Sequence, residues 1–284
     1  MLKQIVLMIV GGAVVVVSAM IIYGDFHWKS TTRKLREQLE IARVPVEPKI
    51  FNSHELVGLP VPVQRYLRAV LTEGQPIVTA VSLEHQGTFN MSTKAEQWYS
   101  FNSTQRVITR RPGFDWSARI AMMAGVPVLV HDAYIAGQGT LHAAIFGLVS
   151  VAQLHGAGEM AQAELMRFLA ETVWYPTALL PSQGVVWSAV DDHSARAMLK
   201  DRDIKLSLLF HFNDNNLIET VSAESRAQMS GGKVTRAPWQ CRLWNYMQRD
   251  GMQVPLDGDA SWVTSDGLKT YWRGHINTLR YEFA

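Results

Sequence analysis

The sequence contains one cysteine, Cys241, among its 284 residues. A single thiol excludes an intrachain disulfide and any metal site built from several cysteines. Because Cys241 lies far from the N-terminus, it also cannot be the acylated cysteine of a lipoprotein. The fold must therefore be held together by its hydrophobic core, which 48% apolar residues can supply.

An excess of charge of one sign is also lacking. The 27 lysines and arginines nearly balance 25 aspartates and glutamates, the net charge is +2, and the basic residues are dispersed along the chain. A surface that binds nucleic acid requires a concentrated basic patch. The composition therefore predicts no nucleic-acid partner.

Motifs for cofactors and metals are incomplete. Gly137-Gln138-Gly139 begins like a dinucleotide-binding loop, but the third glycine is absent and a strand pattern follows instead of a helix. Asp191, Asp192 and His193 are candidate metal ligands, yet neighbouring residues on a strand point to opposite faces, and solvated acids in a short turn are the commoner use. We therefore expect no cofactor and no bound metal.

Long apolar runs are present at the N-terminus. Residues 5–23 are nearly uncharged and apolar, over about the 20 residues that span a bilayer core. Val17-Ser18-Ala19 resembles a signal-peptide cleavage site, but the apolar run continues through Ile22 and is longer than a signal peptide needs. We interpret residues 1–24 as an uncleaved, single-pass transmembrane anchor in the cytoplasmic membrane.

The residues after the anchor leave the side of the membrane open. Lys3 precedes the span, whereas Lys29, Arg33, Lys34 and Arg36 follow it, so the positive-inside rule favours a cytoplasmic domain. An anchor with the opposite orientation can also carry a basic helix after its span. Residues 25–58 are predicted to form this charged helix and a proline-containing stalk, and residues 59–284 to form a β-rich domain.

In that domain the apolar residues recur with a period of two, which is typical of antiparallel strands. The expected strands are 81–91, 99–107, 114–122, 126–135, 139–148, 185–190, 195–200, 204–212, 217–224, 239–248, 254–264 and 269–283. Turn residues such as Asn213-Asp214-Asn215-Asn216 and Asp250-Gly251 separate them. The pattern predicts a mainly β (α+β) fold with one large curved antiparallel sheet or half-barrel.

Helical periodicity interrupts the strands at 158–172 and ends before Pro176. One face of this helix is apolar and consists of Ala161, Leu165, Phe168 and Thr172, and a neighbouring face carries Glu164, Arg167 and Glu171. A shorter amphipathic helix is expected at 61–71. We expect the central helix to lie on the concave side of the sheet.

Candidate site residues are few. Glu171, Arg167, Asp191 and Asp192 are catalytic candidates, because burial of a carboxylate raises its pKa for acid–base work; a solvated helix face with ion pairs is the structural alternative. Nine tryptophans and twelve methionines suit either a core or an apolar pocket. The candidates for ligand binding are Trp116, Tyr134, Met160, Phe168, Trp174 and Trp187.

Several segments together are similar to a known family. They are Leu59-Pro60, Phe114-Asp115-Trp116, Asp132-Ala133-Tyr134, Trp174-Tyr175-Pro176 and Tyr271-Trp272-Arg273-Gly274. Over residues 59–283 the chain resembles an uncharacterised bacterial family, a domain of unknown function with an N-terminal hydrophobic anchor. That resemblance implies no established activity. The order of strands and helices is similar to the half-barrel of periplasmic lipoprotein carriers, which wrap a curved sheet over an apolar cavity.

From these observations we expect a membrane-anchored, non-enzymatic protein that binds a lipid or other apolar molecule. An envelope hydrolase that uses carboxylates near the central helix, and a scaffold with no pocket, are the alternatives. An enzyme requires a positioned acid–base pair in a pocket, a carrier requires a cavity, and a scaffold requires neither.

Overall fold

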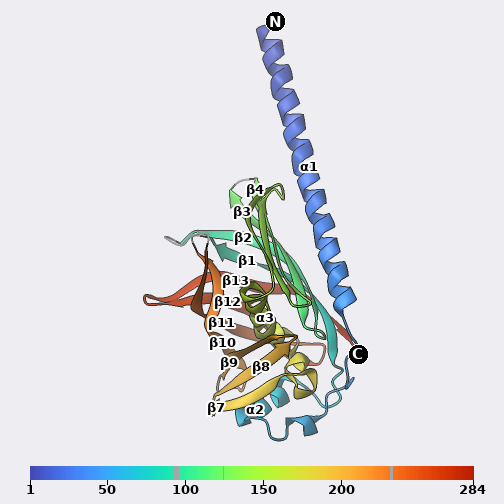
Figure 1. Cartoon of the computed structure of the whole chain (residues 1–284), viewed down its shortest axis with the longest axis vertical. Coiled ribbons are helices and arrows are strands. Elements are labelled where there is room, and N and C mark those ends of the chain that lie inside the picture. The colour runs from blue at the N-terminus through green and yellow to red at the C-terminus, as the bar shows by residue number, and fades with distance from the viewer. Residues whose placement is uncertain (92–95, 124, 231–232) are drawn as a thin grey trace.

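The structure is a computed structural model and describes residues 1–91, 96–123, 125–230 and 233–284. It consists of one 13-stranded antiparallel sheet, a long N-terminal helix on one face of the sheet and a shorter helix on the other (Figure 1). The strands are β1 (Val78–Asn90), β2 (Trp98–Ile108), β3 (Gly113–Met123), β4 (Val126–Ile135), β5 (Gln138–Ile145), β6 (Val149–Gly156), β7 (Val186–Asp191), β8 (Ser194–Asp201), β9 (Ile204–Phe212), β10 (Ile218–Ser230), β11 (Lys233–Arg249), β12 (Met252–Thr264) and β13 (Gly267–Phe283). The predicted fold class is thereby confirmed.

The order of strands explains why a helix crosses the sheet. Hairpin connections run from β1 outward to the edge strand β6 and from the other edge strand, β7, back to β13, which pairs with β1 in the middle. The chain must therefore pass from one edge of the curved sheet to the other after β6. Helix α3 (Glu159–Glu171) and three short 3₁₀ segments between Thr172 and Gln183 make this passage on the concave side.

Alternation along the strands places the core on the concave side. In β9 Leu206, Leu208 and Phe210 are buried, while the residues between them are less so. The apolar face of α3 packs on this surface, with Ala161 and Leu165 fully buried. Burial of this apolar area is the main stabilising contribution to the fold.

The predicted strand at 139–148 differs from the structure, and β10 and β11 are longer than the predicted 217–224 and 239–248. Residues 139–148 were expected to form a single strand, but β5 ends at Ile145, the chain turns at Phe146 and Gly147, and β6 follows. Phe146 and Gly147 have positive φ angles, 53° and 69°, and the turn closes with a hydrogen bond from the Leu148 N–H to the Ile145 carbonyl oxygen. Gly147 stands between the apolar residues Phe146 and Leu148, so the composition gives only a weak turn signal.

The N-terminal helix α1 (Leu2–Ala42) is continuous through the predicted anchor and the predicted juxtamembrane helix. Its N-terminal part is exposed, and its length and hydropathy suffice to cross a membrane. Its C-terminal part packs on the convex face, where Trp28 stacks on His131 with ring centroids 4.2 Å apart. Arg36 Nε donates to the buried Asp115 Oδ2 at 3.0 Å. Burial raises the pKa of Asp115 to about 6, and Arg36 opposes this shift.

Helix α2 (Val61–Val70) covers one end of the sheet and contacts β8 and β12. Pro62 stands in its first turn, where a missing backbone donor costs nothing. The predicted stalk also packs on the domain, since Val46 is buried and Ile50 forms an isolated bridge with Pro76.

Candidate functional site

A hollow lies between α3 and the concave face of the sheet, and it has two adjoining parts. The inner cavity has a volume of about 130 Å³ and is lined by aromatic residues that include Trp116 and Trp174. The outer part has a volume of about 490 Å³ and is bordered by Met160 and Leu141. Both parts share the lining residues Phe89, Asp132, Arg226 and Tyr271.

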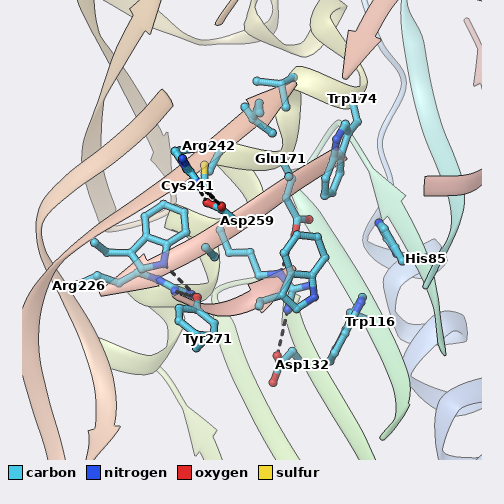
Figure 2. A pocket seen from close by; sticks show the side chains of 18 of the residues that line it. His85, Trp116, Asp132, Glu171, Trp174, Arg226, Cys241, Arg242, Asp259 and Tyr271 are labelled. Atoms are coloured by element: carbon cyan, nitrogen blue, oxygen red, sulfur yellow. Dashed lines mark hydrogen bonds and ion pairs between the residues drawn. The ribbon is translucent and has the colours of Figure 1, made fainter. Parts of the chain in front are cut away.

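Arg167 of α3 lies at the centre of a buried cluster of ionic side chains. Its Nε donates to Glu171 Oε1 at 2.7 Å and a terminal nitrogen donates to Asp132 Oδ2 at 3.0 Å (Figure 2). The guanidinium carbon lies 4.9 Å from the ring centroids of both Phe114 and Trp116, which are cation–π distances. Helix spacing of four residues aligns Arg167 with Glu171, and the alternation of β4 turns Asp132 towards them.

Arg226 of β10 is a second buried cation beside the same hollow. Its donors contact the Ala163 carbonyl oxygen and the Tyr271 hydroxyl, both at 3.3 Å, and its guanidinium carbon lies 5.0 Å from the Trp239 ring centroid. The Trp239 indole N–H also donates to Tyr271 at 3.0 Å. Among the described residues, Arg226 forms no ion pair within 4.0 Å.

Burial controls the protonation of the groups around the hollow. Burial, together with Asp132, raises the pKa of Glu164 to about 8, so this side chain is mainly protonated at pH 7. Burial also raises the pKa of Asp132, which the Arg167 charge opposes. Burial and then the Arg167 charge lower the pKa of His85 to about 3, so His85 is neutral at pH 7.

The six predicted ligand-binding residues separate into two groups. Trp116 and Trp174 line the inner cavity, and Met160 lines the outer part. The other three belong to the core: Tyr134 donates to Asp201 at 2.6 Å, Trp187 donates to the Leu179 carbonyl oxygen at 3.0 Å, and Phe168 packs on Tyr175. None of these last three borders either part of the hollow.

The four catalytic candidates do not meet at one place. Arg167 and Glu171 line the inner cavity, where they bind each other. Asp191 and Asp192 lie on the exposed β7–β8 turn; the Asp191 carboxylate accepts from the backbone N–H of His193, and the Asp192 carbonyl accepts from Arg65. In the part of the chain that the structure describes, no group of three or more His, Cys, Asp or Glu side chains could hold a metal ion.

Sequence patterns left several residues of the site unassigned, among them His85, Gln105, Asp132 and Arg226. The strand alternation places two of these polar residues on buried faces. His85 shares a face with Val81 and Leu83, and Gln105 shares a face with Val107. Gln105 Nε2 donates to Glu171 Oε2 at 2.5 Å, so it completes the hydrogen bonding of that carboxylate.

We predict that Glu171→Ala destabilises the protein by about 1–3 kcal/mol, because Arg167 and Gln105 each lose a buried partner while Asp132 still compensates part of the charge. Thermal and urea unfolding of the full chain measures this change. Glu224→Ala is the matched control, since Glu224 pairs with Arg196 on the surface and its side chain is 85% exposed. An unchanged unfolding free energy in Glu171→Ala would contradict the prediction.

The fold and the site define a class of protein in which a curved antiparallel sheet and a crossing helix enclose a partly polar hollow. The chain belongs to a family of unknown function (DUF6920), whose model matches residues 57–281. This confirms the resemblance seen in the sequence. No curated protein matches the chain.

Two solved structures are similar to the chain at low identity. A LolA superfamily protein from Nitrosomonas europaea is 11% identical, with a TM-score of 0.35, over 78% of this chain and 94% of that one. A beta-barrel-like protein of a domain of unknown function (DUF1849) from Brucella abortus is 10% identical, with a TM-score of 0.21, over 72% of this chain and 99% of that one.

Proposed function

We propose that the protein is a membrane-anchored, non-enzymatic binding protein that holds a lipid or other apolar molecule in the hollow between α3 and the sheet. The observation that carries this proposal is the outer part of the hollow, about 490 Å³, which lies within the range of about 300–1,000 Å³ common for ligand pockets. Its wall includes Phe89, Leu141, Leu154 and Met160. Each methylene of a ligand that is buried there contributes about 0.8 kcal/mol.

The two alternatives fit the site less well. A scaffold protein needs no ligand cavity. If α3 filled the concave side of the sheet completely, no hollow would remain there. A hydrolase needs an acid and a base free to act on a substrate, but Glu171 and Asp132 are both bound to Arg167. Glu164 is the carboxyl group that best suits the hydrolase alternative, since its pKa is raised to about 8.

Lipid retention tests the proposed function. The full chain is purified in detergent, washed, extracted with organic solvent and analysed for lipid by mass spectrometry. Met160→Trp places a larger side chain in the outer part of the hollow and should reduce the retained lipid, whereas Met247→Trp on the exposed side of β11 should not. Equal retention by all three proteins would indicate lipid bound only around the anchor and would overturn the proposal.

The proposed anchor gives a separate prediction. We expect the mature protein to retain residues 1–24, because the apolar run continues beyond Val17-Ser18-Ala19 and α1 continues without a break into the domain. Intact-mass spectrometry of the protein from membranes measures this. A mass that begins at Met20 would show a cleaved signal peptide, and reporter fusions after Arg36 would decide on which side of the inner membrane the domain lies.

A further inference from the structure

Four residues that line the inner cavity each carry a buried polar atom that has no hydrogen-bond partner in the protein. These atoms are Trp116 Nε1, Trp174 Nε1, His85 Nε2 and Asp132 Oδ1. Trp116 and His85 are each 2% exposed and Trp174 is 5% exposed. A buried polar group without a partner costs about 1–3 kcal/mol, so four around one cavity indicate a site for a polar group rather than for an alkyl chain.

The size of the inner cavity limits what this group can be. Its volume of about 130 Å³ is below the range of about 300–1,000 Å³ common for whole ligands, so it suits one end of a molecule. The outer part continues from the inner cavity past Phe89 and Tyr271 to the apolar side chains of Leu141 and Met160. The hollow therefore suits a molecule with a small polar end and an apolar chain.

The charges around the inner cavity cancel, which favours a neutral polar end. Arg167 and Arg226 supply two positive charges, and Asp132 and Glu171 supply two negative charges; the remaining charged residues of the lining, Arg242 and Asp259, form an ion pair with each other. Glu164, which borders the outer part, is protonated at neutral pH. A charged ligand group would leave one buried charge uncompensated, at a cost of several kcal/mol.

We propose that the hollow takes an amphiphile whose uncharged, hydroxyl- or amide-bearing head group occupies the inner cavity between Trp116, Trp174 and Asp132, while its chain lies in the outer part. This proposal rests on the proposed function. The indole N–H groups donate to the oxygen of the head group, and Asp132 Oδ1 accepts from its hydroxyl or amide hydrogen. Hydroxyl and amide groups both donate and accept, as this set of protein atoms requires.

Native mass spectrometry of the full chain released from detergent micelles tests the head group. The probes are monooleoylglycerol, oleamide, oleate and oleylamine, which share one chain and differ in head group and charge. We expect the two uncharged probes to bind more tightly than oleate and oleylamine. Trp116→Phe and Trp174→Phe remove one donor each with little loss of volume and should each weaken binding of the uncharged probes about tenfold, the equivalent of one hydrogen bond of about 1.4 kcal/mol.

A matched control variant tests whether the effects are specific to the inner cavity. The possible outcomes then distinguish a failure of the head-group assignment from a failure of the proposed function. Trp244→Phe alters a tryptophan that is 45% exposed on the other face of the sheet and should leave all binding unchanged. Binding of all four probes with equal affinity, unaffected by Trp116→Phe and Trp174→Phe, would overturn the head-group assignment but not the apolar hollow. Binding of none of them would overturn both.

A second, independent observation concerns the β5–β6 turn, residues 146–148, which lies against the end of the predicted membrane span. A side chain at Gly24 would overlap the carbonyl oxygen of Phe146 and the side chain of Leu148, so only glycine allows this approach. Gly24 directly follows the apolar run that ends at Tyr23. The turn is thereby held at the level where α1 would leave the membrane.

The hairpin that carries this turn has the composition of a surface in contact with lipid. Residues 133–158 include no Asp, Glu, Lys or Arg. Leu148 is 41% exposed and Val149 is 62% exposed, although β6 is an edge strand, which proteins usually protect with charged residues. Tyr23 and Phe26 of α1 are also exposed at the same level, and aromatic residues are typical of membrane interfaces.

We infer that the β5–β6 turn inserts into the bilayer surface beside α1 and fixes the orientation of the domain to the membrane.

The test replaces Leu148 by cysteine in a Cys241→Ser background, attaches an environment-sensitive fluorophore and places the full chain in bilayers with brominated acyl chains. We expect strong quenching at position 148 and none for Val190→Cys, which is equally accessible on the other edge strand. Quenching for Val14→Cys in α1 but not for Leu148→Cys would overturn the inference and leave the anchor intact. Absence of quenching at both position 14 and position 148 would overturn the anchor as well.

Discussion

Arg167→Ala should destabilise the protein by about 3–5 kcal/mol, because it leaves two buried carboxylates, Asp132 and Glu171, without their shared cation. The loss also removes the stacking of the guanidinium on Phe114 and Trp116. The expected effect exceeds that of Glu171→Ala, after which Arg167 still has Asp132. Urea unfolding of the full chain in micelles, followed by tryptophan fluorescence, measures the difference.

The control for this substitution is Arg196→Ala. Arg196 also pairs with a glutamate, Glu224, but at the surface, where such pairs contribute less than about 1 kcal/mol. Acidification gives a second check, because burial raises the pKa of Asp132, and its protonation removes an unpaired charge and should reduce the penalty of Arg167→Ala. Equal stability losses in Arg167→Ala and Arg196→Ala would show that the buried cluster contributes little to the fold.

Much of the fold follows from local patterns. The strands, their turns and the central helix are visible because burial on one face of a sheet imposes a period of two and burial of one helix face imposes a period near 3.6. The β5–β6 turn escaped detection because it packs against α1 at Gly24 and its one glycine, Gly147, stands between the apolar residues Phe146 and Leu148. Local sequence cannot reveal a contact between segments more than a hundred residues apart.

The site could be predicted only in part, for a similar reason. Helix spacing alone brings Arg167 and Glu171 together, whereas Asp132 joins them only through the placement of β4 under α3. Arg226 could not be found by counting alternate residues, because a register shift between Ala223 and Arg226 changes the phase of burial in β10. Trp116 and Trp174 were found as candidates because large aromatic residues commonly line apolar cavities.

Glu164 should make the stability of the protein depend on pH between about 6.5 and about 8. Its pKa is about 8 in the folded protein against 4.5 in an unperturbed glutamate, so the folded state binds a proton that the unfolded state has released over this interval. The contribution of Glu164 to stability is complete below pH 4.5 and is lost as pH rises through about 8. His85 and His131, with pKa values of about 3 in the folded protein, bind protons only in the unfolded state near the ordinary histidine pKa of 6.5, so they raise the stability with rising pH at the lower end of this window and oppose Glu164 there.

The contribution of Glu164 to the unfolding free energy should therefore fall with rising pH, by up to about 1.4 kcal/mol per pH unit, the value for a difference of one bound proton. Glu164→Gln keeps the shape of the side chain but cannot ionise, and it leaves the histidines unchanged, so we expect the unfolding free energy of the wild type to fall relative to that of Glu164→Gln across the same window. Urea titrations at several pH values give the slopes directly. Glu159→Gln, an exposed position in the first turn of the same helix, should retain the wild-type slope. A wild-type slope in Glu164→Gln would show that another group binds the proton, and would leave Glu164 ionised beside Arg226 instead of neutral.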